Sequence, residues 1–270
     1  MNKPPAIPCV MVFAGNDPTG GAGVQADIET LASMGCQAAP VITAITVQDT
    51  QGVKDYTGLS ATLVIEQARA ILEDMPVAAF KIGMLGRRDI AEAVHTLIAA
   101  YPKVPVVLDP VLASGSHYSF ADDQIKAVMT SLLLPLTTVL TPNSLEARAL
   151  APSADTLDAC AQQLLEYGSE YVLITGTHEN TPNVVNTLYA NRRLLESFSW
   201  ERLPGSYHGS GCTLASAIAG MLAHGLEPFT AIREAQQYTW EALKYGYCPG
   251  HGQHLPNRLF WAREEEDQEA

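Results

Sequence analysis

The stretch His208-Gly-Ser-Gly-Cys-Thr-Leu-Ala-Ser-Ala-Ile-Ala-Gly-Met-Leu222 contains two glycines around a serine, then a cysteine, then a regular apolar pattern. Apolar residues recur at positions 214, 217, 218, 221 and 222, which is the spacing of a helix with one buried face. His224 falls in the last turn of this helix, and Gly225 can end it. The sequence therefore predicts a helix with Gly209 and Gly211 where the chain turns into it.

The start of this helix has the properties of an anion-binding site. The first backbone N–H groups of a helix have no partner inside it, and the helix dipole adds partial positive charge there. Glycines allow an anion to approach such a backbone closely. Cys212 lies in the same field, which is expected to lower the pKa of its thiol. The alternative is a helix start made of small residues with a buried, inert cysteine, and this stretch alone does not separate the two.

Composition and charge argue against several classes of protein. The 270 residues are 47% apolar, which is enough to bury a sizeable core. The net charge of -13 disfavours a nucleic-acid partner, which needs a basic face. Five cysteines without a CxxC pair disfavour a disulfide framework or a structural zinc site. Residues 1–8 lack the apolar core of a signal peptide, and no apolar run could span a bilayer, so we expect a cytoplasmic protein without a membrane partner.

The chain alternates between expected strands and helices. Strands are expected at residues 9–14, 39–47, 78–82, 104–108, 138–140 and 171–175, and a hairpin at 184–199. Helices are expected at residues 24–34, 62–73, 89–100, 122–133, 156–167 and 230–244, with a further one opened by 141–146. This alternation predicts an α/β fold with a mostly parallel sheet and helices on both faces. We expect one domain over residues 1–270, with its core at 9–245 and an acidic tail at 264–270.

Polar and glycine-rich clusters follow the expected strands. They fall at residues 15–23, 48–52, 83–86, 109–110, 143–146, 175–176 and 209–212. In open α/β sheets, ligands bind beyond the carboxyl ends of the strands. Any one cluster could be turn chemistry, but so many at one edge of a sheet are hard to explain as turns alone. We therefore expect the ligand site at this edge.

Four side chains in or beside these clusters suit particular ligands. Asp27 and Gln48 can recognise a polar ring, since a carboxylate accepts and an amide both donates and accepts hydrogen bonds, as an aminopyrimidine edge requires. Asp109 and Glu146 can hold Mg²⁺ directly or through water. Two alternatives stay open: Asp27 can be a solvated residue of the first helix, and Glu146 can cap a helix three positions after Asn143.

Other motifs carry less weight. Gly21-Ala-Gly-Val-Gln-Ala26 matches a dinucleotide fingerprint, but six residues separate it from the strand end at Ala14, so nicotinamide binding is not expected. The sequence has neither GxxxxGK[ST] nor GxSxG, which disfavours a Walker-type NTPase and an α/β-hydrolase. His117, His178 and His208 have no metal-ligand spacing and are interpreted as loop residues, of which His178 or His208 could contact a phosphate.

Six motifs occur in a characteristic order. They are Ala14-Gly-Asn-Asp-Pro-Thr-Gly-Gly-Ala-Gly-Val-Gln-Ala-Asp27, Val41-Ile-Thr-Ala-Ile-Thr-Val-Gln-Asp-Thr50, Lys81-Ile-Gly-Met-Leu85, Val107-Leu-Asp-Pro-Val111, Leu140-Thr-Pro-Asn-Ser-Leu-Glu146 and Gly209-Ser-Gly-Cys-Thr213. Over residues 9–245 the chain resembles the hydroxymethylpyrimidine/phosphomethylpyrimidine kinases, thiamine-pathway enzymes of the ribokinase superfamily. The resemblance implies a three-layer α/β/α ribokinase-like fold, a homodimer, and ATP and Mg²⁺ as co-substrate and cofactor. It also implies two successive phosphorylations, of 4-amino-5-hydroxymethyl-2-methylpyrimidine and then of its monophosphate.

The resemblance implies roles for individual residues. The pyrimidine pocket would be lined by Gly15, Asp27, Gln48, Met84 and Val111. The anion hole for the transferring phosphoryl group would consist of Gly209, Ser210 and Gly211. Cys212 takes the position at which most of the superfamily has a catalytic Asp. The nucleotide site would contain Asn143, Glu146, Thr175 and Gly176, and the metal site Glu146 and Asp109.

Two departures from the family pattern concern positive charge. Relatives often have Lys-Gly-Gly-His where this chain has Thr175-Gly-Thr-His178, and often carry a Lys where it has Leu112-Ala-Ser-Gly-Ser116. Two cations near the phosphates are therefore missing, and the candidates to replace them are Lys81, Arg87, Arg88 and His178.

Two alternative functions and two candidate lids stay open from the sequence. Pyridoxal or pyridoxine kinase activity is the first alternative, because that substrate is also a heteroaromatic hydroxymethyl compound. A non-catalytic pyrimidine-binding protein on the same fold is the second. Residues 48–58 and 113–119 are the candidates for a lid over the pocket.

Overall fold

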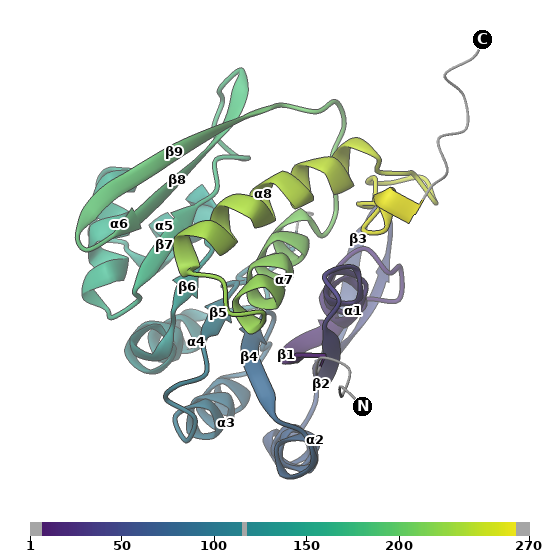
Figure 1. Cartoon of the computed structure of the whole chain (residues 1–270), viewed down its shortest axis with the longest axis vertical. Coiled ribbons are helices and arrows are strands. Elements are labelled where there is room, and N and C mark those ends of the chain that lie inside the picture. Colours follow the sequence, from purple (N-terminus) through teal and green to yellow (C-terminus); the bar gives the residue numbers. More distant parts are fainter. Residues whose placement is uncertain (1–6, 115–117, 263–270) are drawn as a thin grey trace, which may run out of the picture.

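The computed structural model describes residues 7–114 and 118–262, so the tail at 264–270 and His117 lie outside the described residues. The strands are β1 (Cys9–Asn16), β2 (Gln37–Asp49), β3 (Gly52–Gly58), β4 (Val77–Ile82), β5 (Val106–Leu108), β6 (Val139–Leu140), β7 (Tyr171–Ile174), β8 (Asn183–Ala190) and β9 (Arg193–Glu201). Within those residues they form one nine-stranded sheet in the order β3-β2-β1-β4-β5-β6-β7-β8-β9 (Figure 1).

The sheet is mostly parallel, as predicted. Parallel pairs run from β2 through β1, β4, β5 and β6 to β7, whereas β3, β8 and β9 pair antiparallel at the two edges. The strand order reverses between β1 and β4, since β2 and β3 lie on one side of β1 and all later strands on the other. Such a reversal leaves a crevice at the carboxyl ends of the strands.

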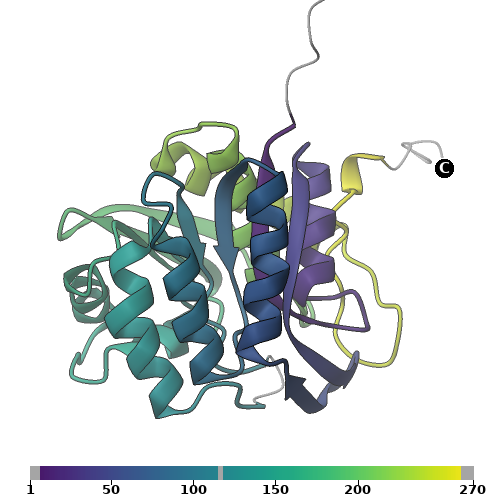
Figure 2. The ribbon, with the colours of Figure 1, turned by 90° about the horizontal axis from the view of Figure 1, so that it is seen from below.

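Two layers of helices cover the sheet. The helices are α1 (Gly23–Ser33), α2 (Ala61–Asp74), α3 (Arg88–Ile98), α4 (Asp123–Val128), α5 (Ser144–Leu150), α6 (Leu157–Glu166), α7 (Ser210–Ala223) and α8 (Pro228–Lys244). Met11 and Phe13 of β1 pack in the core under α2 to α6, whereas Val10 and Val12 pack in the core under α1, α7 and α8. This alternation follows from the two-residue period of a strand. Figure 2 shows the sheet between the two layers, so the three-layer prediction is confirmed.

The structure differs from the expected elements in two places. Residues 48–52, expected as a loop, include the end of β2 and a tight turn into β3, because Asp49 accepts hydrogen bonds from the N–H groups of Gln51 and Gly52. The helix expected at 122–133 becomes a π-helical segment at Met129–Leu133, where the Ser131 hydroxyl bonds the carbonyl of Ala127 at 2.6 Å. The strand β3 itself was not predicted, and the other predicted elements match within a few residues of their expected ends.

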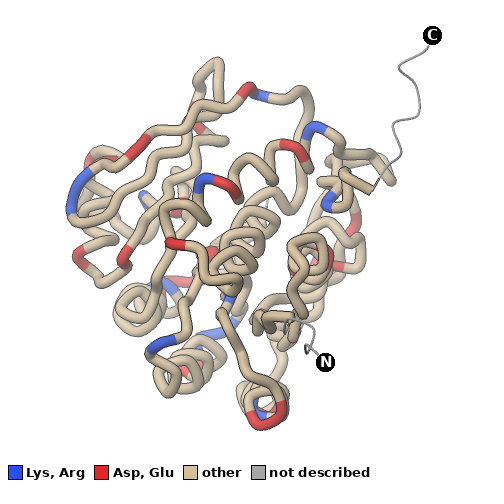
Figure 3. The backbone as a smooth tube through the Cα atoms, in the orientation of Figure 1, with Lys and Arg blue, Asp and Glu red and all other residues tan. Residues whose placement is uncertain are grey.

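Acidic and basic residues are spread over several helices and loops in Figure 3, so the net charge of -13 is not gathered on one element. Among the described residues, none of the helices combines the length and apolar character that crossing a membrane requires.

Candidate active site

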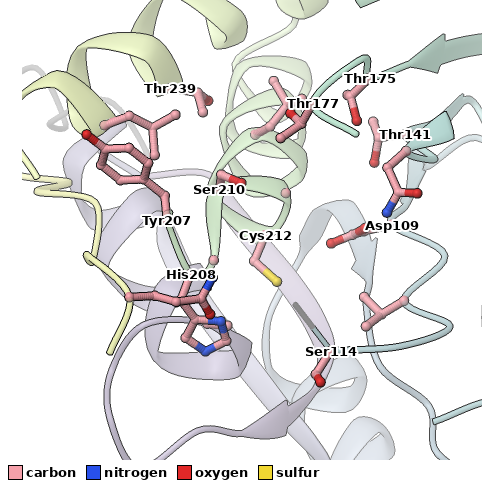
Figure 4. Close-up of a pocket in the computed structure, with 18 of the residues that line it drawn as sticks. Asp109, Ser114, Thr141, Thr175, Thr177, Tyr207, His208, Ser210, Cys212 and Thr239 are labelled. Atoms are coloured by element: carbon pink, nitrogen blue, oxygen red, sulfur yellow. The ribbon is translucent and has the colours of Figure 1, made fainter. Parts of the chain in front are cut away.

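A cavity of about 870 Å³ lies at the carboxyl ends of the central strands. Of the residues predicted to form the pyrimidine, anion, nucleotide and metal sites, those that line it are Gly15, Gln48, Met84, Asp109, Val111, Asn143, Glu146, Thr175, Gly209, Ser210, Gly211 and Cys212. The carboxyl ends of six parallel strands, or the loops directly after them, thus meet the start of α7 in one place. In Figure 4, Cys212 and Asp109 point into the cavity from α7 and from the end of β5.

Two of the predicted site residues do not line the cavity. Asp27 has no accessible surface and forms an ion pair with Lys81 at 2.8 Å behind the site. The prediction that Asp27 contacts the ring is therefore corrected, because its carboxylate already pairs with a buried cation. Gly176 instead packs against β8, where an added Cβ would lie 2.1 Å from the carbonyl oxygen of Val185. Its predicted contact with the nucleotide is likewise not supported by the structure.

Residues 209–212, the predicted anion cradle, have the backbone geometry that the glycines predict. Gly209 caps α7 with φ of 84°, a left-handed conformation that favours glycine. A Cβ on Gly209 would also lie 1.7 Å from the carbonyl oxygen of Gly21, so the loop before α1 packs directly against the start of α7. Gly211 is exposed in the first turn of α7. The N–H groups of residues 210–212 lack acceptors within this helix.

Cys212 does not have the reactive thiolate that its place at the helix start suggests. Burial raises the pKa of its thiol to about 12, although the Lys81 ammonium lowers it, and Asp109 and Asp27 raise it further. The prediction of a lowered pKa was wrong, because the loss of water and the neighbouring carboxylates outweigh the opposing charge of Lys81. Cys212 is therefore a neutral thiol at pH 7.

Asp109 and Glu146 form a pair of carboxyl groups beside the cradle. Burial raises the pKa of Asp109, which Lys81 opposes, and burial together with Asp109 raises the pKa of Glu146 to about 8. Glu146 also completes a capping box with Asn143, accepting its N–H at 3.0 Å. The capping alternative is thus confirmed. No cluster of three or more ligating side chains occurs within residues 7–114 and 118–262.

Gln48 is held by a network that the sequence did not reveal. The ring Nε2 of His208 lies 2.7 Å from the amide of Gln48 and 2.8 Å from the carboxylate of Asp17. Burial alone would raise the pKa of Asp17, but hydrogen bonds from His208 and Thr19 lower it. His208 therefore orients a predicted ligand contact. In the sequence, Asp17 stands out only as part of the turn-rich loop at residues 15–23. Its contact with His208 was not predicted, because the two residues are far apart in the chain.

The candidate cations differ in their distance from the cavity. Lys81 and His178 line it. Arg87, which precedes α3, pairs with Asp89, and Arg88 pairs with Glu92; both pairs are exposed and lie outside this cavity. Of the four candidates, only Lys81 and His178 therefore lie at the cavity.

The two candidate lids contact each other beside the apolar end of the cavity. Tyr56 of β3 packs edge-on against Tyr118 and Phe120, with ring centroids 6.1 and 5.5 Å apart. Met84 and Val111 belong to the same apolar cluster. Residues 115–117 of the second candidate lid lie outside the described residues, so the lid roles stay predictions.

Comparison with known proteins identifies the family. The sequence pattern described as phosphomethylpyrimidine kinase matches residues 17–257. The chain belongs to the phosphomethylpyrimidine kinase family. It is 37% identical over 265 residues to a hydroxymethylpyrimidine/phosphomethylpyrimidine kinase of Mycobacterium tuberculosis, covering 95% of this chain and 96% of the relative. It is also 36% identical over 253 residues to a hydroxymethylpyrimidine/phosphomethylpyrimidine kinase of Synechococcus elongatus, covering 92% of this chain and 96% of the relative.

Solved structures show the same fold. A phosphomethylpyrimidine kinase from Clostridium difficile aligns with a TM-score of 0.76 at 32% identity, over 88% of this chain and 100% of that chain. The pyridoxal kinase from Staphylococcus aureus in complex with AMP-PCP and pyridoxal aligns with a TM-score of 0.87 at 27% identity, over 96% of each chain. These alignments confirm the ribokinase-like fold, and the family assignment makes this chain a phosphotransferase.

Proposed function

We propose that the chain phosphorylates 4-amino-5-hydroxymethyl-2-methylpyrimidine and then its monophosphate, with ATP as phosphoryl donor, for thiamine biosynthesis. The observation that carries the proposal is that Gln48 and the anion cradle at residues 209–212 line one cavity. A ring bound at Gln48 can therefore present its substituent to the start of α7. Membership of the family supports the same activity.

The two ends of the cavity suit two different ligands. At one end, Gln48 offers an amide, and Met84 and Val111 offer apolar contacts, which suits a small polar ring. At the other end, Trp240 and Thr175 offer an apolar wall and a hydroxyl for a nucleotide. Figure 4 shows Ser210 and Cys212 between Thr177 and Thr239 on one side and His208 on the other. The cradle would thus lie where the terminal phosphate of the nucleotide meets the ring.

This arrangement suits phosphoryl transfer, which depends on positioning and on stabilising charge in a loose transition state. The N–H groups at Ser210, Gly211 and Cys212 would bind the equatorial oxygens of the transferring group. Asp109 and Glu146 fit Mg²⁺, because the repulsion between these two neighbouring carboxylates would be relieved by a divalent cation. When bound with the nucleotide, such an ion neutralises phosphate charge that the missing lysines do not.

The two steps make different demands on proton transfer. The first acceptor is an alcohol, which must lose its proton as the new bond forms. The second acceptor is a phosphate, whose second pKa is about 6, so it is already largely ionised at pH 7. We propose that the neutral Cys212 thiol relays the proton in the first step: it takes the proton of the alcohol as it passes its own proton to the Asp109 carboxylate, with which it hydrogen-bonds beside the cavity.

One assay tests the proposed activity. The chain is incubated with ATP, Mg²⁺ and the hydroxymethylpyrimidine, and the pyrimidine products are separated by charge while ADP is measured. We expect the monophosphate first and the diphosphate later, each with one ADP released. Binding of the pyrimidine without release of ADP would instead support the non-catalytic alternative and reject the proposal.

Pyridoxal is a second candidate substrate, favoured by the alignment with the Staphylococcus aureus pyridoxal kinase. ADP release with pyridoxal and with the pyrimidine, measured side by side at equal concentrations, separates the two. A higher kcat/KM for pyridoxal would make pyridoxal phosphorylation the main activity.

We also propose that the enzyme is a cytoplasmic homodimer. All five cysteines are free thiols, which suits a reducing compartment. Ile45 and Val47 of β2 are 51% and 57% exposed beside the sheet edge, and a second copy could cover them. Sedimentation velocity measures the assembly directly, and the mass of a single chain at micromolar concentration would contradict the dimer.

A further inference from the structure

A segment near the C-terminus, residues 246–258, packs against two parts of the site and is called the strap below. The N–H of His254 donates to the carbonyl of Ser206, and the N–H of His208 donates back to the carbonyl of His254, both at 2.9 Å. The N–H of Gln253 donates to the carbonyl of Thr50 at 2.8 Å, and Gln253 also lines the cavity. The strap therefore joins the turn between β2 and β3 to the segment that leads into α7.

The last residue of the strap is a buried arginine. Arg258 is only 2% exposed. Its Nε donates to the hydroxyl of Thr213 at 3.0 Å, and its Nη2 donates to the carbonyl of Gly21. Its Nη1 donates to the carbonyl of Gly20 at 3.2 Å and to the carboxylate of Glu29 at 2.9 Å. One planar guanidinium thus serves four acceptors, which the point charge of a lysine could not do.

These contacts place Arg258 directly behind the anion cradle. Thr213 lies in the first turn of α7, and its hydroxyl donates to the carbonyl of Gly209 at 2.8 Å. A Cβ on Gly209 would lie 3.0 Å from Nη2 of Arg258 and 1.7 Å from the carbonyl oxygen of Gly21. Since the loop at residues 20–21 touches Gly209, the group that fixes this loop also fixes the direction of the cradle.

The charge of Arg258 adds to the effect of the helix N-terminus. Its only ion-pair partner among the described residues is Glu29, whose side chain is 45% exposed. Water screens the Glu29 carboxylate more than it screens the buried guanidinium, so positive charge dominates on the side of the cradle.

We propose that Arg258 is a positioning residue for phosphoryl transfer: it fixes the loop at residues 20–21 against the first turn of α7 and places a permanent positive charge behind the cradle. The inference rests on the proposed function, because the anion in question is the terminal phosphate of the bound nucleotide. Arg258 touches neither this phosphate nor the pyrimidine, and it acts through the backbone at Gly209 and Gly21.

The test compares two nucleotides that differ in their terminal phosphate. The Kd values of ADP and of AMP-PCP, which keeps a third phosphate but transfers it poorly, are measured by calorimetry for the unsubstituted chain, Arg258→Met and Arg258→Lys. In Arg258→Met we expect the Kd of AMP-PCP to rise by roughly tenfold and that of ADP by less than about threefold. Arg258→Lys should fall between, since it keeps the charge but not the fork of donors.

Two control variants separate positioning from general stability. Arg233→Met removes an exposed arginine of α8 that pairs with Glu234, and it should leave both Kd values unchanged. Val94→Ala truncates a fully buried side chain of α3, so it should lower the melting temperature without changing the ratio of the two Kd values. If Arg258→Met does not fold, Arg258→Lys alone carries the comparison.

These measurements distinguish a failure of the proposed role of Arg258 from a failure of the proposed function. Equal losses for ADP and AMP-PCP, or no loss for either, would overturn the role of Arg258. Binding does not require turnover, so a chain that binds AMP-PCP tightly but phosphorylates neither substrate would reject the proposed function and leave this test intact. With an active chain, the kcat of both phosphorylations should fall together in Arg258→Met, because both steps use the same cradle.

Discussion

Gly211→Ala should separate ligand binding from folding at the start of α7. Gly211 is exposed, and the nearest atoms to an added Cβ are the carboxylate oxygens of Asp109, at 3.8 and 3.9 Å. Those are ordinary van der Waals distances, so the protein itself has room for the methyl group. Alanine also has the higher helix propensity, by up to about 1 kcal/mol in a helix interior. The variant should therefore unfold at the same temperature as the unsubstituted chain or slightly higher.

The same methyl group should obstruct the anion. It would project into the cavity where phosphate oxygens must approach the backbone N–H groups at residues 210–212. Loss of one donor to a developing negative charge typically lowers kcat by about 10²- to 10³-fold. We expect Gly211→Ala to slow both phosphorylations by at least about a hundredfold. Gly211→Val, with a larger side chain, should be slower still.

Gly209→Ala is the matched control, because it adds the same methyl group two residues earlier. Gly209 has φ of 84°, where an L-residue costs about 1–2 kcal/mol, and its Cβ would lie 1.7 Å from the carbonyl oxygen of Gly21. For a chain of this size each 1 kcal/mol lowers the melting temperature by about 2–4 °C. Gly209→Ala should therefore lose several degrees, whereas Gly211→Ala should lose none.

The two variants are compared by thermal unfolding and by product analysis with the alcohol and the monophosphate as separate acceptors. Activity in Gly211→Ala within about threefold of the unsubstituted chain in both steps would refute the cradle, because the predicted loss is far larger. A melting temperature as low as that of Gly209→Ala would also refute the reasoning, since the activity loss could then come from misfolding.

Three further predictions follow from the site. Cys212→Ser should slow the phosphorylation of the alcohol more than that of the monophosphate, because only the alcohol must lose a proton; equal losses in separately measured rates would remove Cys212 from the proton transfer. The pKa of Glu146 is about 8 in the folded protein, against an ordinary value of 4.5 in the unfolded chain. Without Mg²⁺, the free energy of unfolding therefore decreases as the pH rises from 4.5 to about 8. Glu146→Gln keeps the capping geometry, and its melting temperature should fall less between pH 5 and pH 8; an identical fall would show that Glu146 ionises freely in the fold. Lys81→Met should lower the free energy of unfolding in urea by about 3–5 kcal/mol by leaving the buried Asp27 carboxylate unpaired, and Lys81→Met/Asp27→Asn should regain most of it. An unchanged urea midpoint in Lys81→Met would contradict the buried pair.

Local patterns explain why much of the fold and most of the cavity were predictable. The periodicity after Gly211 marks α7 because a helix buries every third or fourth residue. The alternation of strands and helices fixes a parallel sheet, and a parallel sheet brings all its strand ends to one edge. Gly15, Asp109 and Asn143 therefore fall in one cavity although they are far apart in the chain.

The predictions for Asp27 and Cys212 failed because both depend on contacts between segments that are far apart in the chain. Asp27 lies three residues after Val24 and four before Leu31, both buried, so the helical period already placed it on the buried face. Its partner Lys81 is on a different element, and the sequence does not show which cation meets it. The predicted direction of the Cys212 pKa shift was wrong for a related reason. Desolvation depends on all the residues packed around the thiol and not on the start of the helix alone.

A chain with a net charge of -13 repels a nucleotide at a distance, so the charges that bind one must act at short range. The structure supplies them as buried or fixed groups: the amides at the start of α7, and the buried Lys81 and Arg258. Such groups are poorly screened by salt and need no reordering when a phosphate arrives. The overall charge should thus slow association, whereas the site itself determines affinity and orientation. Lysines on a loop are therefore not the only way to bind a phosphate. A fold that directs backbone N–H groups toward the phosphate needs few of them.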